Sequence, residues 1–152
     1  MSAYLDGLKM LARRELSEAQ VRQRLARKQH DSEAIDAAVA RLREERAIDD
    51  ARVAEAIART ETSIRRRGKL RVRMQIERAG IGKAIAKQAV DAVFDAIDDD
   101  AQIEASLQKR LRGRQVIADD REFQRLYRYL LSQGFESDRI VRLLNRRRHE
   151  KT

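Results

Sequence analysis

Three runs of adjacent aspartates are the clearest candidates for chemistry in this 152-residue chain. They are Asp49-Asp50, Asp98-Asp99-Asp100 and Asp119-Asp120. Carboxylate oxygens are the ligands that Mg²⁺ prefers. All three runs, however, lie at junctions between predicted helices, where a carboxylate accepts hydrogen bonds from free backbone amides and offsets the helix dipole. We therefore predict that these aspartates cap helices and do not bind metal.

The other residue types needed for catalysis are scarce. His30 and His149 are the only histidines, and cysteine is absent. No Ser-His-Asp or Cys-His set can therefore be assembled. The tripeptide Arg67-Gly68-Lys69 is too short for a phosphate-binding P-loop. We expect a protein that is not an enzyme and that holds no cofactor. We also expect His30 to lie in a loop, and His149 to belong to a frayed basic tail with Arg146–Arg148.

Basic residues dominate the charge. The chain has 34 lysines and arginines against 25 acidic residues, a net charge of +9 and a pI near 10.4. Such a balance favours a polyanionic partner such as nucleic acid. The densest segment is Arg59–Arg78, with eight basic residues and two acidic ones. The alternative is a set of solvated helix faces that point in unrelated directions.

The candidate binding residues come from three equivalent segments. If equivalent helices face one way, their cations form a stripe along the molecule. The candidates for contact with DNA or a partner protein are Arg22, Arg24, Lys28, Arg65, Arg66, Arg67, Lys69, Arg71, Arg73, Arg125 and Arg128. Among the aromatic residues near the last pair, we expect Phe123, Tyr127 and Phe135 in the core. Tyr129 is the candidate for stacking on a base.

The elements that must position these residues are helices. The chain has no proline and only six glycines, which predicts an all-α fold. Segments 17–42, 68–93 and 122–147 can be laid over one another, with a period of about fifty residues. Val21, Val72 and Leu126 then align, as do Leu25, Ile76 and Leu130, and Val39, Val90 and Leu144. We predict three repeats of three helices, over 1–48, 49–98 and 99–152.

Local signals place the helices within each repeat. Ser17 opens a capping box and Asp31 is a good N-cap, whereas Gly80 and Gly134 stand just past helix ends. Periodicity predicts the inward stripe of each first helix. These stripes are Leu5, Leu8, Leu11 and Ala12; Val53, Ile57 and Ile64; and Ile103, Leu107 and Leu111.

Three motifs resemble the tandem units of the RecX family of bacterial regulatory proteins. They are ARRELSEAQVRQRLARK (12–28), AIDDARVAEAIARTETSIRRRGKLRVRMQIERAGI (47–81) and EFQRLYRYLLSQGFESDRI (122–140). The resemblance implies an elongated, curved array of three-helix repeats. It also implies binding to the RecA recombinase, in particular to its filament on single-stranded DNA. There it implies inhibition of ATPase, strand exchange and co-protease activity.

These inferences define one main hypothesis and one alternative. In the first, a monomeric cytoplasmic regulator occupies the filament groove or blocks filament extension, contacts the single strand within the filament, and binds free DNA weakly. The alternative is a stand-alone protein of helix-turn-helix type that binds duplex DNA. The N-terminus has no signal-peptide pattern, and no apolar run approaches the roughly 20 residues of a membrane helix.

Overall fold

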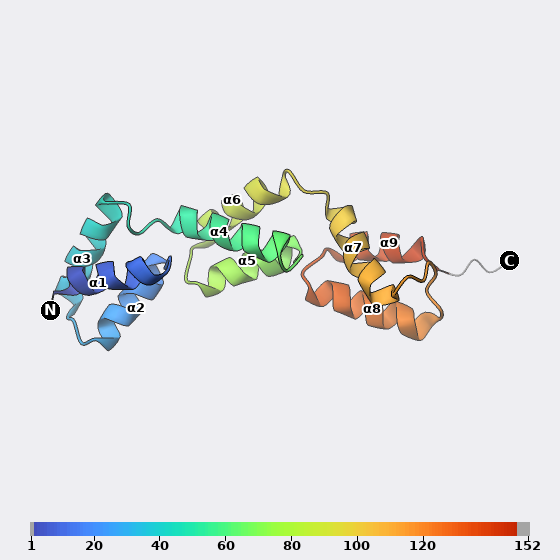
Figure 1. Cartoon of the computed structure of the whole chain (residues 1–152), viewed down its shortest axis with the longest axis horizontal. Helices are drawn as coiled ribbons and strands as arrows, with labels where there is room; N and C mark the ends of the chain where they lie inside the picture. Colours follow the sequence, from blue (N-terminus) through green and yellow to red (C-terminus); the bar gives the residue numbers. More distant parts are fainter. Residues whose placement is uncertain (1, 149–152) are drawn as a thin grey trace. The chain divides into compact units, whose positions relative to one another are not determined.

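The computed structural model describes residues 2–148, which form nine α-helices and no β-strand. The helices are α1 (Ala3–Arg13), α2 (Glu18–Arg27), α3 (Ser32–Glu44), α4 (Asp50–Ser63), α5 (Lys69–Arg78), α6 (Lys83–Phe94), α7 (Asp99–Leu111), α8 (Asp120–Ser132) and α9 (Ser137–Asn145). Figure 1 follows them along the chain. The all-α prediction is confirmed.

The helices gather into two compact units. One unit comprises Met1–Ile57 with Gln75–Ala89, and the other comprises Ala58–Met74 with Val90–Thr152. Helices α1, α2 and α3 pack pairwise in the first unit, and α7, α8 and α9 pack pairwise in the second (Figure 1). Helices α4, α5 and α6 each contribute residues to both units.

The positions aligned from the sequence are equivalent in burial. All nine lie in the core, with exposed fractions from 0% to 7%. They are Val21, Leu25, Val39, Val72, Ile76, Val90, Leu126, Leu130 and Leu144. Burying one such aliphatic side chain contributes roughly 1.5–3 kcal/mol, so each repeat depends on its own copy of this small set.

The aspartate runs cap helices, as predicted. Asp49 Oδ1 accepts a hydrogen bond from the Arg52 amide at 3.1 Å at the start of α4. Asp98 and Asp119 do the same for the third amide of α7 and α8. Ser17 forms the expected capping box with Gln20, and Asp31 caps α3. In the described residues, no group of three His, Cys, Asp or Glu side chains is arranged to hold a metal ion.

Two of the predicted first-helix stripes were partly wrong. Leu5 is 50% exposed, and α1 instead buries Ala3, Asp6 and Gly7. A methyl group at Gly7 would lie 2.7 Å from Leu42, so α1 approaches α3 through its small residues, a contact that the leucine spacing does not indicate. Ile64 follows the last residue of α4 and is 76% exposed. The stripe of α7, formed by Ile103, Leu107 and Leu111, is fully buried as predicted.

Candidate nucleic-acid interface

The middle basic segment passes through a tight junction between the start of α5 and the end of α8. The Gly68 amide donates to the Gln133 carbonyl at 2.8 Å, and the Leu70 amide donates to the Gly134 carbonyl at 3.1 Å. A methyl group at Gly68 would lie 2.5 Å from backbone atoms of Gly134. The backbone carbonyls that follow the last turn of α8 thus find donors at the start of α5. We call this contact the glycine junction.

Two of the predicted binding arginines belong to the junction. Arg71 Nη1 donates to the Ser132 carbonyl at 2.8 Å. The Nε and Nη1 atoms of Arg67 are inaccessible to solvent and have no hydrogen-bond partner among the described residues, and the same holds for Glu61 Oε2. Arg67 and Arg71 were both predicted as binding residues, but their side chains turn toward the protein.

The other predicted cations of the segment differ in their exposure to solvent. Arg65 and Arg66 are exposed, and Arg65 lies 3.6 Å from Glu61 Oε1. Lys69 is half-buried, with its Nζ 5.9 Å from the centre of the Phe94 ring. Arg73 is half-buried as well.

Lys69 also influences a buried carboxyl group. Burial raises the pKa of Asp99 above its ordinary value, against the opposing effect of the positive charges of Lys69 and Arg139. The middle segment thus combines exposed arginines, among them Arg65 and Arg66, with cations that contact other parts of the protein.

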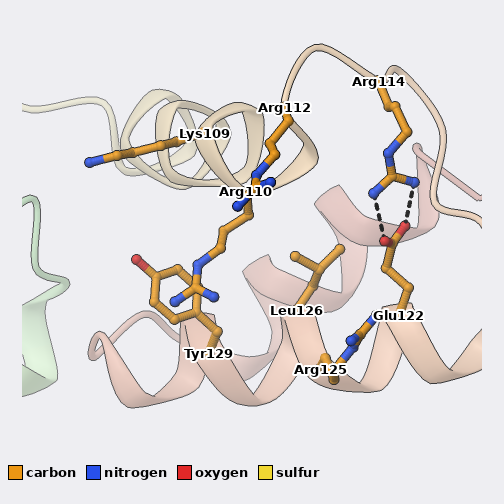
Figure 2. Close-up of a pocket in the computed structure, with 8 residues that line it drawn as sticks. All are labelled: Lys109, Arg110, Arg112, Arg114, Glu122, Arg125, Leu126 and Tyr129. Carbon is orange, nitrogen blue, oxygen red and sulfur yellow. Dashed lines mark hydrogen bonds and ion pairs between the residues drawn. The ribbon is translucent and has the colours of Figure 1, made fainter.

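The third repeat carries a basic hollow between the end of α7 and the outer face of α8 (Figure 2). Its volume is about 670 Å³. It is lined by Lys109, Arg110, Arg112, Arg114, Glu122, Arg125, Leu126 and Tyr129. We call it the third-repeat hollow. Of the two arginines predicted here, Arg125 lines the hollow, whereas Arg128 is exposed outside that lining.

The single acid of the third-repeat hollow is already paired. Arg114 donates to both carboxylate oxygens of Glu122, at 3.0 and 2.6 Å, as the dashed lines in Figure 2 show. The Ala118 amide donates to the same carboxylate. The hydrogen bond from Arg114 and the one from Ala118 lower the pKa of Glu122 to about 2. Glu122 is therefore ionised but internally neutralised, and the remaining cations set the potential of the hollow.

A stacked pair forms one wall of the third-repeat hollow. The guanidinium carbon of Arg110 lies 3.6 Å from the centre of the Tyr129 ring. Tyr129 also packs against the core formed by α7, α8 and α9. This contact holds a planar cation on a rigid support beside the apolar side chain of Leu126 (Figure 2).

A similar hollow of about 480 Å³ lies in the first repeat, between the end of α1 and α2. We call it the first-repeat hollow. Its lining includes one acid, Asp6, and six basic residues: Lys9, Arg13, Arg14, Arg24, Arg27 and Lys28. Arg24 and Lys28 were predicted as binding residues. Arg13 and Arg14, the cations at the end of α1, were not predicted as binding residues, although α7 also ends in a run of basic residues.

Asp6, the acid of the first-repeat hollow, also has partners within the protein. Asp6 Oδ2 lies 2.6 Å from His30 Nε2, and Lys28 Nζ lies 3.9 Å from Asp6 Oδ1. The hydrogen bond from His30 holds the pKa of Asp6 below its ordinary value. Arg22, which was also predicted to bind, does not line the hollow. It pairs with Asp36 at 2.6 Å and with Glu18 at 3.2 Å.

Arg147 and Arg148 are more firmly held than expected. Arg147 is an interior ion-pair partner, with Nη2 2.5 Å from Glu104 Oε2 and a side chain only 13% exposed. Its carbonyl accepts a hydrogen bond from the Ile117 amide at 2.7 Å, and the Arg148 guanidinium lies 4.1 Å from the Phe123 ring centre. The prediction of a frayed tail is thus wrong for Arg147 and Arg148, whereas His149 lies outside the described residues.

Comparison with known proteins identifies close similarity to one family. The model of the first three-helix domain of RecX matches residues 3–42. The chain is 32% identical over 136 residues to a regulatory protein RecX of Syntrophotalea carbinolica, covering 89% of each protein. It is 30% identical over 139 residues to a regulatory protein RecX of Halorhodospira halophila, covering 88% of this chain and 81% of the relative.

Solved structures agree on the fold. The crystal structure of RecX from Lactobacillus salivarius superposes with a TM-score of 0.78 at 20% identity, over 95% of this chain and 93% of the other. A second crystal structure of a regulatory protein RecX gives a TM-score of 0.79 at 20% identity, over 95% and 70% of the two chains. No helix between residues 2 and 148 is long and apolar enough to cross a membrane.

Proposed function

Because the chain belongs to the RecX family of regulatory proteins, we propose that it regulates the RecA recombinase. In this proposal it binds RecA and RecA filaments on single-stranded DNA. It inhibits ATPase, strand exchange and co-protease activity by occupying the filament groove or blocking filament extension. It acts as a monomer in the cytoplasm, without catalysis of its own.

The observation that carries the proposal is the pair of basic hollows. Each is lined mainly by lysine and arginine side chains, and each contains one carboxylate that is already paired inside the protein. Such surfaces attract phosphates and acidic protein surfaces, and they repel other cationic regions. In this proposal the filament presents phosphates of the single strand together with acidic surface of the recombinase, whereas free DNA offers only phosphates.

Occupancy is sufficient to explain inhibition. A regulator that binds the filament more tightly than it binds free RecA or free DNA shifts the equilibrium toward the regulator-bound filament by that difference in affinity. ATP turnover falls if the bound form cannot undergo the subunit movements that hydrolysis requires. No residue of the regulator then needs to take part in chemistry.

The direct test measures the DNA-dependent ATPase of RecA during titration with this protein. We expect inhibition at concentrations of the regulator well below that of RecA, because one molecule that blocks growth affects many subunits. Unchanged ATPase activity at equimolar regulator would refute the proposal. Tight binding to duplex DNA in the same preparation would then favour the helix-turn-helix alternative.

The exposed arginines of the middle repeat give a sharper test. Replacing Arg65 and Arg66 by alanine removes two exposed charges near the glycine junction without breaking a hydrogen bond to α8. We expect weaker inhibition with unchanged helicity. The matched variant Arg71→Ala removes one charge together with the bond to Ser132, so it should also lower the thermal stability. If the double variant inhibits like the wild type, these arginines are only a solvated surface.

A further inference from the structure

We propose that the third-repeat hollow binds one nucleotide unit. The phosphate lies among Lys109, Arg112 and Arg125, and the base stacks on the Arg110 guanidinium that Tyr129 supports. The proposal assigns distinct parts of one surface to the two parts of the ligand. This proposal depends on the function proposed above in one respect only, namely that the nucleotide belongs to a single strand of DNA.

The phosphate part follows from the charges that remain available. The side chains of Lys109, Arg112 and Arg125 are exposed, and none forms a hydrogen bond or ion pair with another described residue. Glu122 is mainly neutralised by Arg114, which contacts both of its carboxylate oxygens, and the charge of Arg125 is the smallest of the effects that lower its pKa. Guanidinium and ammonium groups without internal partners bind phosphate oxygens through charge-assisted hydrogen bonds.

The base part follows from the stacked pair and the apolar floor. The guanidinium carbon of Arg110 lies over the Tyr129 ring, 3.6 Å from its centre, so the ring supports the guanidinium group before any ligand arrives. Leu126, a core residue that is 7% exposed, is the apolar member of the lining and lies between the stacked pair and Arg125 (Figure 2). Unpaired bases stack on guanidinium planes and aromatic rings of this kind. A volume of about 670 Å³ is also within the range of sites that hold a nucleotide.

The first-repeat hollow provides an internal comparison. When Leu25 is aligned with Leu130, Arg24 takes the place of Tyr129, and both residues line their hollows. The first-repeat hollow therefore has the cations but lacks the aromatic support. We expect it to bind phosphate without a preference for a base, which makes it the matched control.

The surface suits a nucleotide within a strand better than a free nucleotide. Binding sites for small molecules usually enclose most of their ligand, whereas the cations of the third-repeat hollow are exposed along one side of α7 and α8. A strand can lie across such a surface with one base seated and its neighbours in solvent. A free nucleoside triphosphate offers the same phosphate and base, and the experiment must separate the two sources.

The first experiment compares two labelled strands of about 8 nucleotides by fluorescence anisotropy with the full chain. One strand is oligothymidine and the other is its abasic counterpart. We expect the wild type to prefer thymidine by about 5- to 100-fold. Arg110→Lys keeps the charge but loses the planar stack, so the preference should disappear. Arg24→Lys in the first-repeat hollow should preserve it.

The second experiment separates phosphate binding and the source of the nucleotide. Arg125→Ala should reduce the dependence of log K on log salt by about 0.7 for the single strand and leave the thymidine preference in place. ATP is tested alone by equilibrium dialysis. Binding of ATP that Arg110→Lys weakens would assign the site to free nucleotides; no ATP binding together with the thymidine preference would assign it to a strand.

One pattern of results would overturn the proposal. It fails if ATP does not bind and the folded Arg110→Lys variant keeps the wild-type ratio between thymidine and abasic strands. Circular dichroism checks the fold of each variant. Because neither experiment contains a recombinase, failure here leaves the ATPase test of the proposed function unaffected.

Discussion

The glycine junction makes a quantitative prediction for Gly134→Ala. Gly134 has φ +97°, and an added methyl group would overlap the backbone nitrogen and Cβ of Arg71. A left-handed conformation costs a residue other than glycine about 1–2 kcal/mol, and forced crowding in a packed region costs about 1–3 kcal/mol. The reduced entropy of the unfolded chain returns about 0.4–1 kcal/mol. We therefore expect a net loss of about 2–4 kcal/mol.

Substitutions at Gly113 and Gly68 separate the two costs, namely the strain of a left-handed backbone and steric crowding. Gly113 has φ +86°, but no atom lies within 4 Å of an added methyl group, so Gly113→Ala should cost only about 1 kcal/mol. Gly68 has no left-handed strain, yet its methyl group would meet backbone atoms of Gly134 and Phe135 at 2.5 Å. Gly68→Ala should thus show the cost of crowding alone, about 1–3 kcal/mol.

Urea denaturation followed by far-ultraviolet circular dichroism measures these differences, and thermal denaturation checks them. For a chain of this size, each kcal/mol lowers the melting temperature by roughly 2–4 °C. Gly134→Ala should therefore melt about 5–15 °C below the wild type. If Gly134→Ala and Gly113→Ala differ by less than about 0.5 kcal/mol, the crowding argument is wrong and α5 does not press on the end of α8 as described.

Three further predictions concern stability. The pKa of Glu122 is lowered to about 2, so its ionised form stabilises the fold above its ordinary pKa of 4.5, and this contribution is lost as the pH falls toward 2. The urea midpoint should therefore fall less between pH 5 and pH 2.5 in Glu122→Gln than in the wild type, and equal slopes would contradict this. Arg147→Ala breaks the pair with Glu104 and should cost about 1.5–3 kcal/mol in the same assay, whereas the exposed control Arg146→Ala should change stability by less than about 0.5 kcal/mol. A fragment of residues 49–98 should lack a cooperative thermal transition, because its helices share their residues between two compact units; a sharp transition with native helicity would refute that reasoning.

The sequence by itself determined the helical class, most helix ends and the repeated core. Helix caps depend on residues three or four positions apart, so Ser17, Asp31 and Asp98 could be identified without tertiary contacts. Burial at Leu25, Ile76 and Leu130 followed from the same local periodicity in each repeat.

The tertiary structure decided which cations are available to a ligand. In the sequence, Arg66 and Arg71 belong to one basic run and cannot be told apart. In the structure, Arg66 is exposed, whereas Arg71 donates a hydrogen bond to a carbonyl 61 residues away. The two basic hollows depend on the ends of α1 and α7 lying beside α2 and α8. Periodicity within one helix cannot supply these relations, because they arise from the packing of helices against one another. The glycine junction arises in the same way. Gly134 was predicted as a helix terminator, but only the approach of α5 leaves no room for a side chain at this position.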